Sequence, residues 1–150
     1  EKLCQEFANH FKDMGIETVI GPATGGIILS QVTARLLGVR SIFTERENGK
    51  MTLRRGFKVA PGEKVLIVED IVTTGGSIKE VVDVVNEAKG DIVGIGLLVD
   101  RSGGTADFGV PQEKVYPLLH LTVPTYKPEE CPLCKEGVPI TERGSHHLKK

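Results

Sequence analysis

A buried strand that ends in two adjacent carboxylates and leads into a glycine-rich turn is the strongest constraint in this sequence. The apolar residues Val65–Val68 predict the strand, Glu69 and Asp70 follow it, and Thr73-Thr74-Gly75-Gly76-Ser77 opens a helix. The N–H groups of such a turn, at the positive end of a helix dipole, bind anions, whereas paired carboxylates accept hydrogen bonds from vicinal hydroxyl groups. The pattern predicts a site for a phosphorylated sugar. The alternative is a strand, a polar turn and a helix that bind no ligand.

Short apolar segments alternate with helical patterns along most of the chain. Strands are expected at 18–21, 40–45, 64–68, 92–99 and 115–121, and helices at 1–14 (from the spacing of Leu3, Phe7, Phe11 and Met14), 27–37 and 78–88. This alternation predicts an α/β fold for residues 1–124, with a mostly parallel central sheet flanked by helices. Residues 46–58 are charged and show no clear period, so we expect a loop there. Residues 125–150 are expected to form an irregular tail.

Polar or charged segments follow the predicted strands at 21–26, 45–58, 69–77 and 100–101. The carboxyl ends of parallel strands meet at one edge of a sheet, and ligands of such folds bind beyond that edge. We therefore expect these segments to converge on one site.

Composition narrows the classes of partner. The net charge of −1 leaves no basic field, which argues against nucleic acid as the main partner, and the apolar runs are too short to cross a membrane. Three cysteines without a secretory leader indicate a reducing compartment, and we expect a cytoplasmic protein. Cys131 and Cys134 form one CxxC motif, which is half of a zinc site at most. Cys4, His146, His147 or a second copy could complete it; the alternative is a tight turn with buried thiols.

The segment Val65–Ser77 resembles the phosphoribosyl-pyrophosphate (PRPP) motif of the type I phosphoribosyltransferases, and the chain from about Glu17 onward is most similar to the orotate-specific members of that family. The resemblance implies their fold and a pentosyltransferase activity. Ribose 5-phosphate would pass from PRPP to orotate, giving orotidine 5′-monophosphate and pyrophosphate for UMP biosynthesis. Mg²⁺ is the implied cofactor, carried mainly by PRPP and not by direct protein ligands.

The resemblance also assigns residues to PRPP. Glu69 and Asp70 would hold the ribose hydroxyls, and the loop after them the 5-phosphate. A second loop at Ala23, Thr24 and Gly25 would hold the pyrophosphate, often through a non-proline cis peptide, which we expect near Ala23–Thr24; the alternative is a turn whose glycines allow tight helix–sheet packing. The complete PRPP set is Ala23, Thr24, Gly25, Glu69, Asp70, Ile71, Val72, Thr73, Thr74, Gly75, Gly76 and Ser77.

Catalysis is assigned to cations as well as to the acid pair. Arg46 and Lys50 match the spacing of a mobile catalytic loop that, in the family, reaches into the neighbouring site of a homodimer, and Arg54 and Arg55 may share its role. The implied loop spans 46–55. The family pattern is broken at two places, Glu47 and Thr52, where many members carry Lys and His. The alternative is a solvated charged loop.

The resemblance also implies that orotate contacts Thr73 and Arg101, and a planar guanidinium suits a carboxylate on a flat ring. The alternative for Arg101 is a surface ion pair. The orotate enzymes carry several dozen further residues before this point, which form a hood over the base, so the resemblance implies that the hood is missing here. Other functions stay open: a purine or uracil phosphoribosyltransferase, a PRPP-sensing regulator without turnover, or a structural remnant.

Overall fold

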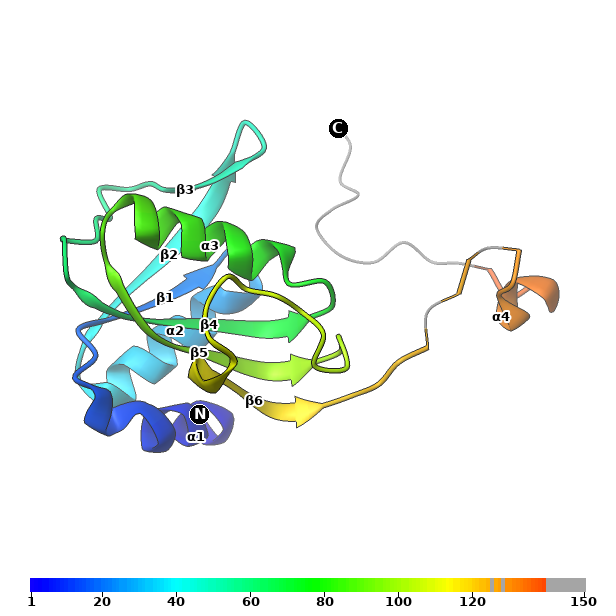
Figure 1. Ribbon diagram of the computed structural model, residues 1–150, viewed down its shortest axis with the longest axis horizontal. Coiled ribbons are helices and arrows are strands. Elements are labelled where there is room, and N and C mark those ends of the chain that lie inside the picture. Colours follow the sequence, from blue (N-terminus) through cyan, green and yellow to red (C-terminus); the bar gives the residue numbers. More distant parts are fainter. Residues whose placement is uncertain (125, 128, 140–150) are drawn as a thin grey trace.

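The computed structural model describes residues 1–124, 126–127 and 129–139, and its centre is a six-stranded sheet in the order β3-β2-β1-β4-β5-β6 (Figure 1). All neighbouring strands are parallel except β2 and β3, which are antiparallel. The strands are β1 (Thr18–Pro22), β2 (Arg40–Glu47), β3 (Lys50–Leu53), β4 (Lys64–Val72), β5 (Asp91–Asp100) and β6 (Val115–His120). The predicted α/β fold with a mostly parallel sheet is therefore confirmed.

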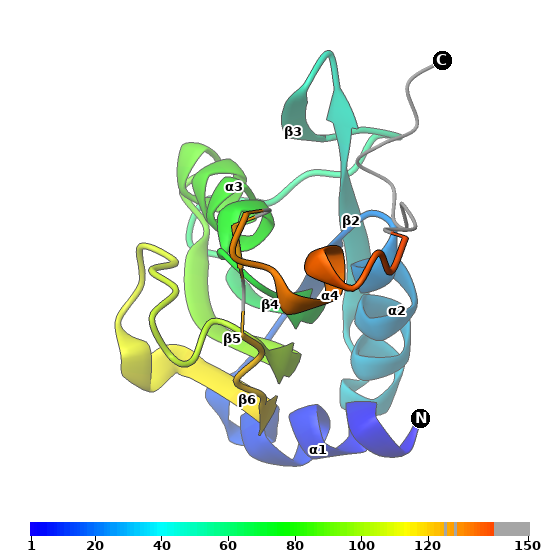
Figure 2. The same ribbon diagram turned by 90° about the vertical axis from the view of Figure 1, so that its right-hand side faces the viewer.

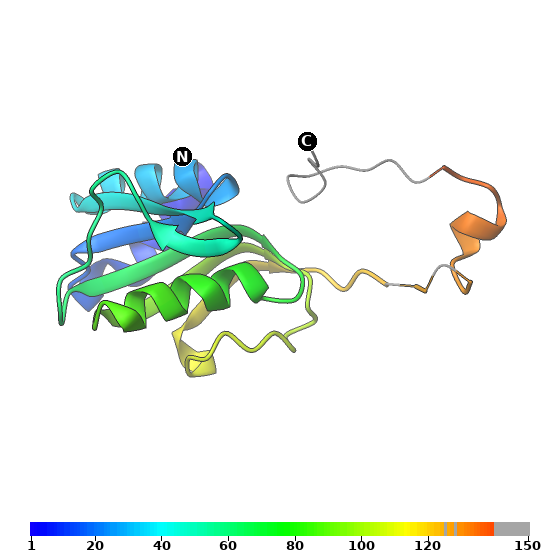
Figure 3. The same cartoon turned by 90° about the horizontal axis from the view of Figure 1, so that it is seen from above.

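Helices cover both faces of the sheet, as Figure 3 shows from above. Helices α1 (Lys2–Phe11) and α2 (Gly25–Leu37) lie on one face, and α3 (Gly76–Glu87) lies on the other. Each face has its own core: Phe7, Phe11 and Leu66 belong to the first, and Ile67 and Ile78 to the second. Burial on both faces explains why the central strands are apolar at nearly every position and do not alternate.

Helix α1 packs closely against β5 because two glycines in that strand leave room for its phenylalanines. A Cβ atom at Gly94 would overlap the Phe11 ring, and one at Gly96 would come within 2.9 Å of the Phe7 ring. Both rings are fully buried. Leu3, which contributed to the apolar spacing that predicted this helix, is exposed instead, because the buried face runs through Cys4, Phe7, Ala8 and Phe11.

Two predicted boundaries are wrong in ways that bear on function. Strand β4 continues to Val72, so Glu69 and Asp70 lie within the strand and not after it. The expected loop at 46–58 contains instead the end of β2 and all of β3, joined in a hairpin at Asn48 and Gly49. Both turn residues have positive φ, 52° and 81°, the backbone of the tight turns that Asn-Gly favours between antiparallel strands.

The end of the chain adds one short helix, α4 (Pro132–Lys135), between Cys131 and Glu136. Residues 125, 128 and 140–150 of the predicted tail, including His146 and His147, lie outside the described residues. Within the described ranges, no helix is long and apolar enough to cross a membrane.

Phe7→Ala should lower the free energy of unfolding by about 3–5 kcal/mol. The substitution removes a fully buried ring, and the glycines of β5 have no side chains that could fill the cavity. Chemical denaturation measures this change. Leu3→Ala, on the exposed side of the same helix, is the matched control and should change stability by no more than about 0.5 kcal/mol. Equal effects of the two substitutions would contradict the observed orientation of α1.

Candidate functional site

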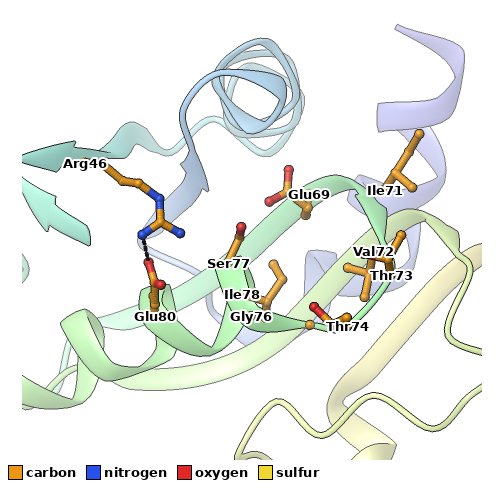
Figure 4. A pocket seen from close by; sticks show the side chains of 11 residues that line it. Arg46, Glu69, Ile71, Val72, Thr73, Thr74, Gly76, Ser77, Ile78 and Glu80 are labelled. Carbon is orange, nitrogen blue, oxygen red and sulfur yellow. Dashed lines mark ion pairs between the residues drawn. The ribbon is translucent and has the colours of Figure 1, made fainter. Parts of the chain in front are cut away.

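A pocket of about 250 Å³ opens at the carboxyl end of β4. In Figure 2 this end of the sheet faces the viewer, between α3 and α2. The loop from β4 to α3 forms most of the pocket, and the β2–β3 hairpin contributes one side chain (Figure 4). The lining residues are Arg46, Glu69, Ile71, Val72, Thr73, Thr74, Gly75, Gly76, Ser77, Ile78 and Glu80. Most of the residues predicted to hold PRPP are thus brought together.

The loop conformation depends on Gly75, which precedes α3 with φ of 82°. A Cβ atom there would also come within 3.0 Å of the buried Phe108 ring, so both the backbone angle and the space favour glycine. Gly75 turns the chain so that α3 begins at Gly76, directly at the pocket. The positive end of the helix dipole and the residues Thr73, Thr74 and Ser77 then line the same pocket, a combination that suits a phosphate group.

Glu69 is the buried acid of the site. Its side chain is 7% exposed, and Oε1 accepts a hydrogen bond from the Asp70 N–H at 3.1 Å. Burial and the neighbouring Asp70 carboxyl, against the opposing effect of that N–H, together raise the pKa of Glu69 to about 8. The free protein therefore holds a protonated carboxyl at neutral pH beside a loop suited to phosphate, and this carboxyl can donate a hydrogen bond as well as accept one.

Asp70 lies beside the second predicted loop and not among the residues that line the pocket. A Cβ atom at Gly25 would overlap the Asp70 carboxylate, so the absence of a side chain at Gly25 allows the two loops to meet. The Ala23–Thr24 peptide bond is cis, as the resemblance implied. The Ala23 N–H donates to the Thr44 carbonyl at 2.7 Å, which ties this loop to β2.

The predicted catalytic cations occupy different positions. Arg46 lines the pocket of its own chain, and its Nη1 lies 2.8 Å from Glu80 Oε2 (Figure 4). Lys50 lies outside that pocket, with Nζ 3.5 Å from Glu87 Oε1 on α3. The sequence analysis missed Glu80, although a signal was present: Glu80 follows Ser77 by three residues, which places both on one face of a helix.

Arg101 is exposed and does not line the pocket. Its backbone N–H donates to the Val72 carbonyl at 2.8 Å, so the ends of β4 and β5 are nevertheless tied together. The residue before it, Asp100, is buried and accepts hydrogen bonds from the Ser102 hydroxyl and N–H. Although burial opposes ionisation, these bonds and the nearby His120 lower the pKa of Asp100, which keeps a fixed negative charge at the end of β5.

The CxxC motif forms the start of α4, where the Cys134 N–H donates to Cys131 Sγ at 3.3 Å. Both thiols are free and partly exposed, and Cys4 is buried on α1. In the part of the chain that the structure describes, no group of three or more His, Cys, Asp or Glu side chains could hold a metal ion.

Comparison with known proteins decides the family. A model of the phosphoribosyl transferase domain matches residues 2–108. The orotate phosphoribosyltransferase of Desulforamulus reducens is 57% identical over 148 residues, which is 99% of this chain and 76% of that protein. The orotate phosphoribosyltransferase of Thermotoga maritima is 57% identical over 145 residues, covering 97% of this chain and 76% of that protein. The chain belongs to the orotate phosphoribosyltransferase family.

Solved structures agree on the phosphoribosyltransferase fold. Adenine phosphoribosyltransferase from Rhodothermus marinus superposes with a TM-score of 0.65 at 22% identity, over 80% of this chain and 78% of that one. The purine phosphoribosyltransferase of Pyrococcus horikoshii gives a TM-score of 0.64 at 18% identity, over 84% of this chain and 91% of that one. At these identities the likeness establishes the architecture alone.

The raised pKa of Glu69 predicts how the stability of this phosphoribosyltransferase depends on pH. Between the ordinary value of 4.5 and the folded value of about 8, the unfolded chain releases a proton that the folded chain keeps. The free energy of unfolding should therefore fall as pH rises from 5 to 8, by a few kcal/mol at most, since one pKa unit corresponds to about 1.4 kcal/mol.

Glu69→Gln should remove this dependence, and denaturation at a series of pH values measures it. Glu113→Gln, which removes an exposed carboxyl, is the control and should keep the slope of the unaltered protein. A slope unchanged by Glu69→Gln would contradict the assignment of the proton to this side chain.

Proposed function

We propose that this chain is an orotate phosphoribosyltransferase, which converts orotate and PRPP to orotidine 5′-monophosphate and pyrophosphate in UMP biosynthesis. The observation that carries the proposal is the 57% identity to orotate phosphoribosyltransferases over nearly the whole chain. The pocket supports it, because the Glu69 carboxyl and a hydroxyl-rich helix N-terminus line it together, with Asp70 next to Glu69 in β4. In this proposal residues 1–124 form the catalytic core, and 125–150 are a tail outside it.

The roles of the PRPP residues follow from their positions. Thr73, Thr74, Gly75, Gly76 and Ser77 hold the 5-phosphate through hydroxyl and backbone N–H groups. Glu69 and Asp70 bind the ribose hydroxyls from the last residues of β4, with Ile71 and Val72 connecting the acids to the loop.

The remaining contacts to PRPP fall to the second loop. Ala23, Thr24 and Gly25 hold the pyrophosphate, next to Asp70. The two loops thus hold the two charged ends of PRPP, with the acid pair between them at the sugar.

The reaction is a displacement at the anomeric carbon of the ribose. The bond from this carbon to the pyrophosphate oxygen breaks, and its pair of electrons leaves with pyrophosphate. A ring nitrogen of orotate forms the new bond, and the proton that this nitrogen carried passes to pyrophosphate or to solvent. Positive charge develops on the sugar, where an ionised Asp70 stabilises it. Holding both reactants in line and neutralising pyrophosphate supply most of the acceleration.

Mg²⁺ fits this site as a cation carried mainly by the substrate. No group of three or more His, Cys, Asp or Glu side chains that could hold a metal ion is present among the described residues. Mg²⁺ prefers oxygen donors, and phosphate groups supply them. The phosphate oxygens of PRPP would therefore supply most of its ligands. When bound, Mg²⁺ neutralises part of the negative charge on pyrophosphate.

The remaining assignments concern orotate, the partner subunit and the compartment. Arg101, with Thr73, binds orotate, for which the Arg101 side chain must turn toward the pocket. Arg46 and Lys50 neutralise pyrophosphate from a hairpin that, in a homodimer, serves the neighbouring site. The protein acts on small molecules in the cytoplasm, with neither nucleic acid nor a membrane as a partner.

The decisive assay follows the absorbance of orotate with PRPP and Mg²⁺ present and with each omitted in turn. Consumption only in the complete mixture would establish the transfer and its base together. The same assay with adenine, guanine and uracil distinguishes the orotate enzyme from other phosphoribosyltransferases. Binding of PRPP by calorimetry without turnover of any base would favour a sensor, and absence of both would contradict the proposed function.

Asp70→Asn should lower kcat on the order of tenfold or more, because a neutral amide cannot stabilise the positive charge that develops on the ribose. Steady-state kinetics measures this, and the thermal midpoint checks that the fold is intact. Asp13→Asn removes an exposed carboxylate before β1, at the opposite edge of the sheet, and should leave both kinetic constants unaltered. Unchanged kcat in Asp70→Asn would contradict the role of this carboxylate.

Mixing two inactive variants tests whether the hairpin serves the neighbouring subunit. One variant carries Asp70→Asn, and the other carries Arg46→Gln and Lys50→Gln. If the hairpin acts across a dimer, random exchange of subunits should restore roughly a quarter of the unaltered activity, because half of the dimers are hybrids with one complete site. No restoration after confirmed exchange would mean that the hairpin serves its own chain, where Arg46 lies in Figure 4.

A further inference from the structure

The guanidinium of Arg46 is held between the hairpin turn and α3. Nη1 lies 2.8 Å from Glu80 Oε2 and donates to the Gly49 carbonyl at 3.1 Å. Both charged side chains are a little over one third exposed, at 38% and 39%. Figure 4 shows this ion pair at the side of the pocket, next to Ser77. A bound phosphate would therefore meet Arg46 already engaged with a carboxylate.

The contact extends along the hairpin and one face of α3. Met51 of β3 is buried, and Lys50 beside it lies 3.5 Å from Glu87. A groove of about 260 Å³ runs between the two elements, lined by Gly49, Lys50, Met51, Glu80, Asp83, Val84 and Glu87. The acids at 80, 83 and 87 recur at helical spacing and face the hairpin that carries the two cations. The hairpin is thus docked on α3.

Glu80 also lines the pocket that contains the proposed phosphate loop. A phosphate group bound at Thr73–Ser77 repels the Glu80 carboxylate and attracts the Arg46 guanidinium, so it competes directly with the ion pair. A phosphate carries more negative charge than one carboxylate, and its oxygens match the two-pronged geometry of a guanidinium.

We propose that Glu80 is a positioning residue that holds Arg46 through this ion pair and releases it when the 5-phosphate of PRPP binds. The proposal rests on the proposed function and adds a residue that sets affinity for the charged substrate. Breaking the ion pair is part of the free energy of binding, whether the released cation serves its own site or the neighbouring one. Weakening the pair should therefore strengthen binding.

A double-mutant cycle with Glu80→Gln and Arg46→Gln tests this. Calorimetry with PRPP in the presence of Mg²⁺, and separately with inorganic phosphate as a probe of the loop at Thr73–Ser77, gives the dissociation constants. Glu80→Gln should bind both ligands about two- to fivefold more tightly, the size expected for a partly exposed ion pair. In the Arg46→Gln background the same substitution should have less than half of that effect. The gain should appear in KM for PRPP and not in kcat, because the pair is absent from both the bound state and the transition state.

The control is Asp83→Asn, which removes the same charge from the same helix face, at a carboxylate for which the described residues provide no ion pair. Glu80→Asp should retain most of the original affinity, since it keeps the carboxylate. An equal gain from Glu80→Gln with and without Arg46 would show that Glu80 acts only as a nearby charge. Weaker binding by Glu80→Gln would show that it holds Arg46 in its productive position. Either result overturns the proposal.

Failure of the proposed function is distinguished by the unaltered protein. If that protein bound neither PRPP nor inorganic phosphate, the proposed function would fail at once. The same double-mutant cycle can be measured by thermal unfolding without ligand. It then tests the Arg46–Glu80 ion pair independently of binding, because the effects of the two substitutions on stability should be coupled. Absence of that coupling overturns the inference even if the protein is an active transferase.

Discussion

Parallel pairing of β4 with β1 on one side and β5 on the other is the constraint on which the rest of the structure depends. It places the end of β4 beside the ends of its two neighbours, so three separate loops meet at one edge of the sheet. The same pairing buries β4 on both faces, which requires an apolar strand and leaves Glu69 partly enclosed where the apolar run ends. The ligand site and the unusual protonation of its acid thus share one structural cause.

Opposite charges are arranged around this edge in layers. The inner layer is the acid pair and the helix N-terminus, where burial raises the pKa of Glu69. The outer layer is the hairpin and the acidic face of α3, where the ion pairs are exposed enough for solvent and salt to weaken them. Arg46 of this outer layer also lines the pocket, so its ion pair lies where a charged ligand of the pocket would act on it.

Much of this could be predicted from the sequence because local signals and packing agree. The apolar runs at 64–68 and 92–99 are too short for helices. The run of Thr and Gly after Asp70 is typical of a phosphate-binding turn that opens a helix. The hairpin was missed because residues 45–50, around its turn, are charged, polar or glycine, so that periodicity gave no sign of it, although Asn48-Gly49 is a recognised turn signal. The extension of β4 was missed because acids are rare in buried strands.

Side-chain partners were harder to predict than elements. Glu80 looked like one more polar residue of an amphipathic helix, and only the docking of a distant hairpin makes it part of the site. Arg101 was placed correctly along the chain, but the direction of a long exposed side chain depends on its surroundings and not on its neighbours in sequence. Residue type and spacing therefore located the loops, while three-dimensional contacts were needed to pair the charges.

The Asn48–Gly49 turn has a consequence for how the two hairpin cations move. Arg46 pairs with Met51 and Glu47 with Lys50 across the hairpin, so the backbone hydrogen bonds keep both cations in a fixed register. A displacement that frees one cation from α3 carries the other with it. A movement of the hairpin as a unit would therefore change the ion pair of Arg46 with Glu80 and that of Lys50 with Glu87 in one step, and not in two independent ones.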